Sequence, residues 1–163
     1  MSAFAASRRM FAAFPALLAT ILALTMFTAV PADAQRTARQ QRVHNAVQVA
    51  IAQKGDPYVY GYAGPDRFDC SGLVMYSFQR AGLAMPRTTS AQYGAMRHIP
   101  QSQMQRGDLM YFHDSSGHIY HAAMFLGRHD GQVWLLHASR TGTPVKRDPL
   151  WTSSWYGATM RHS

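Results

Sequence analysis

The pattern of apolar and polar positions divides the chain into an apolar start and a globular remainder. Residues 10–30 are almost continuously apolar, and residues 35–42 are polar and basic. From Val43 onward, apolar residues recur at i, i+3, i+4, i+7 and i+8, which predicts an amphipathic helix ending near Gly55. We therefore expect residues 35–42 to form a flexible leader and residues 43–163 to form one folded domain.

A second helix is predicted between Asp69 and Gly82. Asp69 is a favourable N-cap, the apolar residues that follow give one packing face, and Gly82 ends the pattern. A loop rich in proline and threonine comes next, and a short polar helix is expected from Ser90 to Met96. Cys70 would then lie in the first turn of the second helix.

The pattern changes to strands in the second half of the chain. Apolar runs predict strands at three segments, 107–112, 120–127 and 132–138. Residues 128–131, Arg-His-Asp-Gly, give a hairpin signal between the last two strands. Helices followed by strands predict an α+β fold, with helices packed against a small antiparallel sheet.

The register of this hairpin decides whether two histidines share a face of the sheet. His121 lies on the first strand of the hairpin and His137 on the second. A three-residue loop would pair residue 123 with His137 and make the two imidazoles diagonal neighbours. A two-residue turn, Asp130-Gly131, would place them on opposite faces. If the histidines work together, we expect Gly131 in the left-handed conformation of a bulged turn.

The N-terminal residues are typical of an export signal. Arg8 and Arg9 precede the apolar run, and residues 32–34, Ala-Asp-Ala, match the small-residue end of a cleavage site. We expect residues 1–34 to be a cleaved signal peptide, which leaves an exported protein without a stable membrane anchor. A retained anchor is the alternative, and Sec and twin-arginine export are not distinguished. The periplasm or the cell wall is the expected location.

The charge of the chain is strongly basic. The formal net charge is +8, and loss of residues 1–34 would reduce it to +7, because that segment holds two arginines and one aspartate. Such a charge attracts polyanions, which bacterial envelopes offer as carboxylates and phosphates. The basic residues are scattered, and no run of four occurs after residue 34. The pattern predicts a general electrostatic bias rather than a binding site, and no nucleic-acid partner.

Cys70 is the only cysteine in the chain. A single cysteine excludes an internal disulfide, and its absence from the apolar run excludes a lipoprotein anchor. The amide groups and the dipole at a helix N-terminus favour a thiolate, which is the reactive form of cysteine. The alternative is a buried, inert thiol.

A thiolate nucleophile needs an imidazole in reach and a partner that orients the imidazole. Of the eight histidines, four lie on or near predicted strands, and these are His113, His118, His121 and His137. Zinc binding by the first three is an alternative, but their spacing matches no familiar zinc site.

Six short blocks carry the most specific signal in the sequence. In chain order they are 55–61 (GDPYVYG), 68–74 (FDCSGLV), 86–88 (PRT) with Gln92, 106–109 (RGDL), 121–127 (HAAMFLG) and 136–138 (LHA). Together they resemble the NlpC/P60 family of cell-wall cysteine peptidases, from about residue 55 to residue 155. The Asp-Cys-Ser-Gly block is suggestive alone, and the histidine block about fifty residues later makes the resemblance specific.

The resemblance implies a papain-like domain, in which a helix that carries the cysteine packs on an antiparallel sheet that carries the histidine. It implies that Cys70 is the nucleophile, that His121 is the general base and that His137 orients His121. The Tyr58 hydroxyl is expected beside the thiol, where it helps to form the oxyanion hole.

The resemblance also implies a substrate. Asp69 and Ser71 are expected to contact a peptidoglycan stem peptide, although Asp69 can also serve only as the helix cap. Arg87 either lines the groove or has a structural role. The implied reaction is amide hydrolysis through a thioester, at the γ-D-glutamyl–diaminopimelate bond or the D-alanyl–diaminopimelate crosslink, by a monomer without metal or cofactor. A papain-like amidase or acyltransferase with another substrate is one alternative, and a catalytically silent wall-binding protein is the other.

Overall fold

The structure is a computed structural model that describes residues 31–161 of the chain. Three helices precede most of the sheet: α1 (Ala32–Ala52), α2 (Cys70–Arg80) and α3 (Thr89–Gly94). The strands are β1 (Arg97–Ile99), β2 (Leu109–His113), β3 (Ile119–His129), β4 (Gln132–His137), β5 (Lys146–Pro149) and β6 (Trp155–Thr159), with a 3₁₀ turn, η1 (Gln101–Gln103), after β1.

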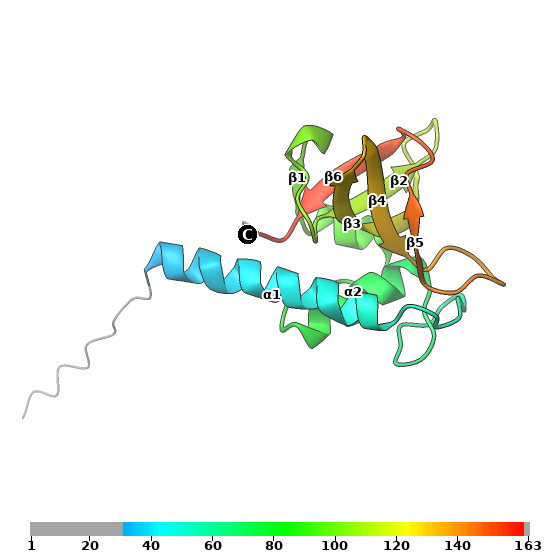
Figure 1. The fold of residues 1–163 in the computed structure, drawn as a ribbon, viewed down its shortest axis with the longest axis horizontal. Coiled ribbons are helices and arrows are strands. Elements are labelled where there is room, and N and C mark those ends of the chain that lie inside the picture. The colour runs from blue at the N-terminus through cyan, green and yellow to red at the C-terminus, as the bar shows by residue number, and fades with distance from the viewer. Residues whose placement is uncertain (1–30, 162–163) are drawn as a thin grey trace, which may run out of the picture.

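The strands form one antiparallel sheet in the order β1-β6-β2-β3-β4-β5. Figure 1 shows α1 and α2 lying together along one side of this sheet. Apolar side chains of both helices pack there against alternate residues of β2 and β3, such as Tyr111 and Met124. The opposite face of the sheet carries a smaller cluster that includes Phe112, Phe125 and Trp155. The α+β fold expected from the sequence, with the cysteine-bearing helix on an antiparallel sheet, is confirmed.

The flexible leader expected at residues 35–42 is wrong, because α1 begins at Ala32 and runs unbroken through it. The segment is rich in arginine and glutamine, which have high intrinsic helix propensity even where no apolar face exists. Buried residues of α1 begin only at Val43, so the N-terminal part of the helix extends beyond the globular body (Figure 1).

The sequence also missed β1, β5 and β6. The outer strands β1 and β5 form the edges of the sheet, where polar residues are tolerated, and β5 reads Lys-Arg-Asp-Pro without any apolar alternation. β6 contains Gly157, where a Cβ atom would lie 2.8 Å from the carbonyl oxygen of Ile99. A glycine is therefore needed for the close approach of β6 to β1, although glycine is a weak strand former.

Of the two alternatives for the β3–β4 hairpin, the structure has the two-residue turn and not the three-residue loop. His129 pairs with Gln132, and Asp130 and Gly131 both have positive φ, 51° and 74°. A β-bulge between Phe125 and Gly127 then adds one residue to β3, so that Met124 pairs with Leu136. This is the register that the three-residue loop would have given. His121 and His137 thus share a face, as predicted, but the bulge and not the turn is the reason.

The predicted signal peptide falls almost entirely on residues 1–30, which lie outside the described part of the chain. Between residues 31 and 161, no helix is long and apolar enough to cross a membrane.

Candidate active site

Cys70 is the first residue of α2, and the local sequence explains how it is held there. The carboxylate of Asp69 caps the helix by accepting a hydrogen bond of 2.7 Å from the backbone N–H of Gly72, as predicted. A Cβ atom at residue 72 would lie 2.1 Å from the carbonyl oxygen of Tyr62, so only glycine fits. The Asp-Cys-Ser-Gly block therefore fixes the start of α2 against the preceding loop.

Asp69 is the centre of a buried polar network on this side of the thiol. Its carboxylate also accepts hydrogen bonds from the Gly61 N–H, at 2.8 Å, and from the Ser71 hydroxyl, at 3.3 Å. Arg87 completes the network with a two-pronged ion pair to Asp69 and a bond of 2.9 Å to the Ser71 hydroxyl. The predicted substrate contacts Asp69 and Ser71 are buried, whereas the Arg87 side chain is 36% exposed.

Gln92 ties α3 to the same region. Its side chain is fully buried, and its Nε2 donates to the backbone carbonyl oxygens of Ser71 and Pro86, both at 2.9 Å. Because these bonds satisfy buried backbone acceptors, Gln92 has a structural part in holding the loop that carries Arg87.

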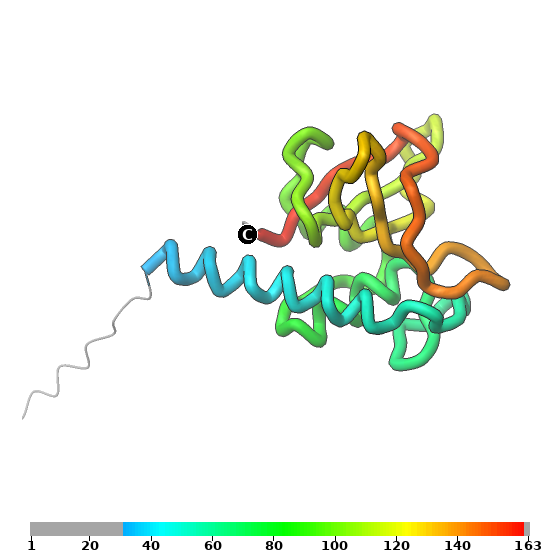
Figure 2. The backbone as a smooth tube through the Cα atoms, viewed as in Figure 1, coloured from blue at the N-terminus to red at the C-terminus, as the bar shows by residue number. Residues whose placement is uncertain are grey.

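Tyr58 reaches the site from the loop after α1. Its backbone N–H donates to the Thr143 carbonyl oxygen at 3.1 Å, which holds the loop against the segment between β4 and β5. Figure 2 shows these two loops side by side at one end of the molecule. The pKa of Tyr58 is raised, first by burial and then by the nearby Cys70 and Asp69. Tyr58 therefore keeps its proton and lies in the electrostatic neighbourhood of the thiol.

His121, His137 and Asp148 form a chain of hydrogen bonds on the sheet. The Nε2 of His121 lies 2.9 Å from the Nδ1 of His137, and the Nε2 of His137 lies 2.9 Å from a carboxylate oxygen of Asp148. The contact between the two histidines was predicted. Asp148, on the polar edge strand β5, was not, because nothing in Lys-Arg-Asp-Pro marks it.

The chain of bonds fixes the tautomers of both imidazoles. Burial tends to raise the pKa of Asp148, but bonds from His137 and Lys146 hold it below its ordinary value, so that the carboxylate is ionised and only accepts. The Nε2 of His137 must then donate, and its Nδ1 accepts from the Nε2–H of His121. The free lone pair of His121 is consequently on Nδ1, the nitrogen that can take a proton from a thiol.

Trp151 covers the two histidines. Its ring stacks on Phe112 with 4.6 Å between the ring centroids, and its centroid lies 5.4 Å from that of His137 and 6.1 Å from that of His121. The tryptophan was not singled out from the sequence, since it lies in a loop without a motif. It helps to keep water away from the imidazoles.

The burial of the site sets its resting protonation state. Burial is the main cause that raises the pKa of Cys70, although the Ala122 backbone N–H lies at the thiol and lowers it. Burial, with a smaller contribution from His137, lowers the pKa of His121 to about 3. Both shifts favour the neutral forms of the two side chains, whereas the amide groups at the start of α2 favour the thiolate.

The structure brings all seven predicted site residues into two adjoining groups. Tyr58, Asp69, Ser71 and Arg87 surround the start of α2, and His121 and His137 lie on the sheet. Cys70 stands between these groups through its contact with Ala122, the residue after His121. Within residues 31–161, no hydrogen bond joins the Cys70 thiol directly to the His121 ring.

The alternative zinc reading has no geometric support. His118 is largely exposed and lies 3.9 Å from Asp114, while His113 stacks on Tyr156. Neither side chain contacts His121 among the hydrogen bonds and ring contacts of the described residues. Over the same range, no three His, Cys, Asp or Glu side chains gather in a way that could hold a metal ion.

The model of the NlpC/P60 family matches residues 55–163. The chain belongs to this family. The probable endopeptidase p60 of Listeria monocytogenes is 41% identical over 109 residues, which are 66% of this chain and 21% of that protein. The chain thus spans only about a fifth to a quarter of the length of the relatives that it matches.

Solved structures show the same fold. The peptidoglycan hydrolase RipB of Mycobacterium tuberculosis is similar with a TM-score of 0.66 and 29% identity, over 81% of this chain and 72% of RipB. RipD of the same organism has a TM-score of 0.61 and 25% identity, over 74% of this chain and 98% of RipD. RipD is described as a non-catalytic NlpC/P60 domain protein adapted to peptidoglycan binding. Family membership therefore establishes the fold, whereas catalysis depends on the residues of the site.

Proposed function

We propose that the protein is a cysteine endopeptidase that hydrolyses amide bonds in peptidoglycan stem peptides. The observation that carries the proposal is the hydrogen-bond chain from His121 through His137 to Asp148, beside a helix that begins with Cys70. A wall-binding protein has no need of an imidazole whose tautomer is fixed by two further residues.

In the first half of the reaction, the Sγ of Cys70 attacks the carbonyl carbon of the scissile amide while its proton passes to the Nδ1 of His121. Since burial disfavours the charged forms of both side chains, we assign His121 the role of general base. The imidazolium is stabilised by the bond to His137 and, through it, by the Asp148 carboxylate. His121 then gives the proton to the leaving amine, which departs and leaves a thioester.

In the second half, His121 takes a proton from a water molecule that attacks the thioester carbonyl. The C–S bond breaks, the proton returns to the Cys70 sulfur, and the product leaves as a carboxylic acid. The balance needs only water and the two side chains, and neither a metal ion nor a cofactor enters a step.

We assign the oxyanion hole to the Tyr58 hydroxyl and the backbone N–H groups at the start of α2. Donors aimed at the developing oxyanion commonly supply the largest electrostatic part of catalysis. We further propose that the stem peptide lies along the exposed side of Arg87. In that arrangement Asp69 and Ser71 act mainly by holding Arg87, since their own polar atoms are already bonded. The γ-D-glutamyl–diaminopimelate bond and the D-alanyl–diaminopimelate crosslink both remain candidate targets.

We also propose that the protein is exported and works as a monomer in the periplasm or at the cell wall. Residues 1–34 would be the signal peptide, and residues 43–163 the catalytic domain. Cleavage after Ala34 would remove the first three residues of α1 and leave the rest of the helix in place.

Purified soluble muropeptides test the proposal. The full chain should cut a crosslinked muropeptide, and Cys70→Ala and His121→Ala should both abolish cutting without loss of fold. Intact-protein mass spectrometry during turnover should detect a stem-peptide adduct on the wild type. Cleavage that persists in Cys70→Ala would overturn the proposed nucleophile.

Similarity to RipD gives one second candidate, a non-catalytic peptidoglycan-binding protein. That reading predicts that sacculi retain the wild type and Cys70→Ala equally and release no peptide to either. A papain-like amidase with another substrate would also leave muropeptides intact, but would still form an acyl adduct on Cys70 with its own substrate.

A further inference from the structure

Five arginines from distant parts of the sequence line one cavity of about 560 Å³. They are Arg36, Arg39, Arg42, Arg97 and Arg161. The cavity lies between the N-terminal part of α1 and the C-terminal end of the chain, and it shares none of its lining residues with the candidate active site. The expectation that the basic residues are scattered is therefore wrong in three dimensions, although it is right along the sequence.

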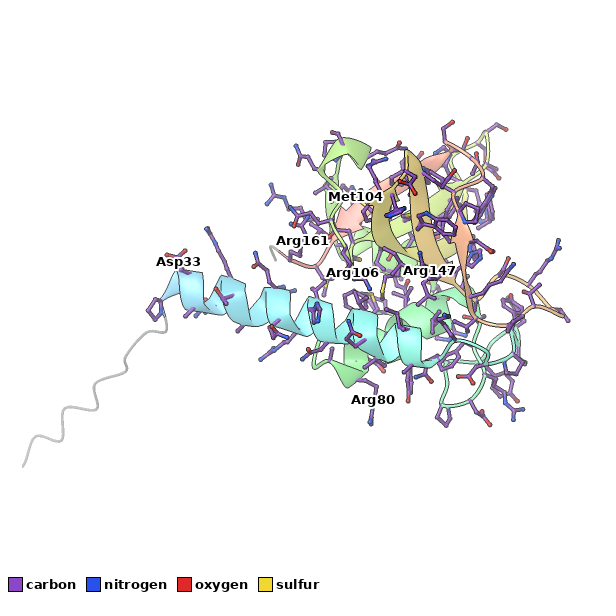
Figure 3. The ribbon with its side chains drawn as sticks, in the orientation of Figure 1. Asp33, Arg80, Met104, Arg106, Arg147 and Arg161 are labelled. Carbon is purple, nitrogen blue, oxygen red and sulfur yellow. The ribbon has the colours of Figure 1, made fainter. Side chains whose placement is uncertain are left out.

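The fold explains this gathering. Arg36, Arg39 and Arg42 follow one another at spacings of three on α1, so they share one broad face of the helix. Arg39 joins this face to the C-terminal segment, because its Nε donates to the Met160 carbonyl oxygen. Figure 3 shows Arg161 in the space between that segment and α1. Arg97 reaches the cavity from the edge strand β1.

Two carboxylates lie beside these arginines. Asp108 is fully buried and makes a two-pronged ion pair with Arg161 at 2.9 Å, and Asp33 lies 4.0 Å from Arg36 in an exposed pair. Arg36, Arg42 and Arg97 remain exposed to solvent. The described residues that line the cavity include no Asp or Glu.

The composition of the cavity points to phosphate. All five cations are arginines, as are all the basic residues of the chain except Lys54 and Lys146, so what matters here is the chemistry of the guanidinium group and not a preference over lysine. The guanidinium group is a planar fork of donors that matches the oxygens of phosphate in pairs, and it is more weakly hydrated than an ammonium group. Several forks around one hollow can engage successive phosphate groups. A flexible polymer chain can enter such a hollow, whereas a flat bilayer surface can only lie across its opening.

We propose that this cavity, formed by α1, β1 and the C-terminal segment, binds the phosphate groups of a phosphate-bearing polymer of the cell envelope. Binding there is separate from catalysis and would hold the enzyme near its wall substrate. Residues 35–42 of α1 would then contribute to binding, because they carry three of the five arginines.

Calorimetric titration of the full chain with short-chain inorganic polyphosphate tests the proposal. The test variant is the triple substitution Arg36→Gln, Arg42→Gln and Arg97→Gln, which spares Arg39 and Arg161 because they hold the C-terminal segment. The matched control is Arg80→Gln, Arg128→Gln and Arg140→Gln, which removes the same charge from exposed positions elsewhere. Figure 3 shows one of these, Arg80, pointing away from the sheet at the far side of the helices.

The test variant should bind polyphosphate at least about tenfold more weakly than the wild type, because it loses several charge-assisted hydrogen bonds. The control should lose less than about threefold, which is the general effect of net charge. Arg97→Gln alone leaves the sequence of α1 unchanged and should weaken binding by a smaller but measurable factor. This single variant replaces the triple variant in the test if the triple variant is unstable.

Equal losses in both triple variants would overturn the proposal, because charge alone would then explain binding. So would equally tight binding of polyglutamate at matched charge, since that result would indicate carboxylate recognition. Binding of phosphatidylglycerol vesicles without binding of polyphosphate would replace the polymer by a membrane surface. Absence of binding by the wild type would also contradict the proposal.

Discussion

The imidazoles of His121 and His137 meet at 2.9 Å because β3 contains one more residue than β4 requires. Without the bulge between Phe125 and Gly127, the two-residue turn at Asp130 and Gly131 would place the histidines on opposite faces of the sheet. A bulge next to a reactive centre re-aims a side chain in just this way. The geometry of the proposed base thus depends on Leu126, the extra residue of the bulge, which is not itself part of the hydrogen-bond chain.

Asp148 is expected to support catalysis without contacting substrate. Asp148→Asn should lower kcat by roughly 10-fold and Asp148→Ala by roughly 100-fold, with little change in KM. In a serine protease, where the carboxylate bonds directly to the catalytic histidine, replacing it by an amide lowers kcat about 10⁴-fold. The losses expected here are smaller because His137 lies between Asp148 and His121. Steady-state kinetics on a purified muropeptide measure both constants.

Lys146→Gln is the matched control for Asp148. Lys146 lies 3.1 Å from the same carboxylate but is 43% exposed at its side chain, so its removal should change kcat by less than about threefold. A rise in KM with an unchanged kcat in the Asp148 variants would contradict a positioning role for this carboxylate.

The sequence predicted the fold class and the start of α2 from local patterns, whereas the turn left the pairing of His121 with His137 open and the family resemblance implied it. Asp69 is followed by an amphipathic helix, and the two histidines stand on apolar strands joined by a turn. Asp148 and Trp151 could not be found in this way. Both belong to polar or irregular segments, and only the pairing of β5 with β4 brings them to His137.

The bulge and the arginine cavity could not be predicted from the sequence for a related reason. A bulge at Leu126 leaves no mark in the order of apolar and polar residues along β3, so the sequence pattern does not reveal it. The five arginines lie up to 125 positions apart in the numbering, and only the docking of α1 beside the C-terminal segment gathers them.

The thiol of Cys70, which is partly buried, should react as a protonated thiol and not as a preformed thiolate. The rate of labelling with iodoacetamide should rise with pH and reach its midpoint above about 8.5, the ordinary value for cysteine, since burial raises the pKa of Cys70. A stopped series of labelling reactions, read by mass spectrometry, gives the profile. Fast labelling with a midpoint below neutral pH would instead indicate a thiolate–imidazolium pair at rest.

Acid should destabilise the fold through His121. Its pKa is lowered to about 3 in the folded protein, so between about pH 6.5 and pH 3 the unfolded chain binds the proton that the folded chain refuses. Stability is therefore complete above the unfolded pKa and falls as the pH drops through this window. The wild type should lose about 2–3 kcal/mol of unfolding free energy from this group between about pH 7 and pH 4.5.

Urea denaturation of His121→Asn at the two pH values checks this assignment, because the variant should lose much less stability on acidification. His129→Asn is the control, since that side chain is 79% exposed and should leave the acid sensitivity of the wild type intact. An identical acid response in His121→Asn and the wild type would mean that another group is responsible.

Arg87 should contribute to stability as well as to the proposed groove. Arg87→Ala leaves the Asp69 carboxylate, which is only 8% exposed, without its cation, and should cost about 2 kcal/mol after allowance for the partial exposure of Arg87. Arg67→Ala, which removes the cation of an exposed pair with Asp66, should have little effect. Equal unfolding free energies for Arg87→Ala and the wild type would refute the structural role.

Mass spectrometry of purified sacculi after digestion tests the central claim most directly. The wild type should release or newly open stem-peptide fragments whose masses name the bond that is cut, and Cys70→Ala should yield none. If the wild type produced no new fragments under conditions in which a known endopeptidase cuts the same sacculi, the account of this site as a peptidoglycan endopeptidase would be contradicted.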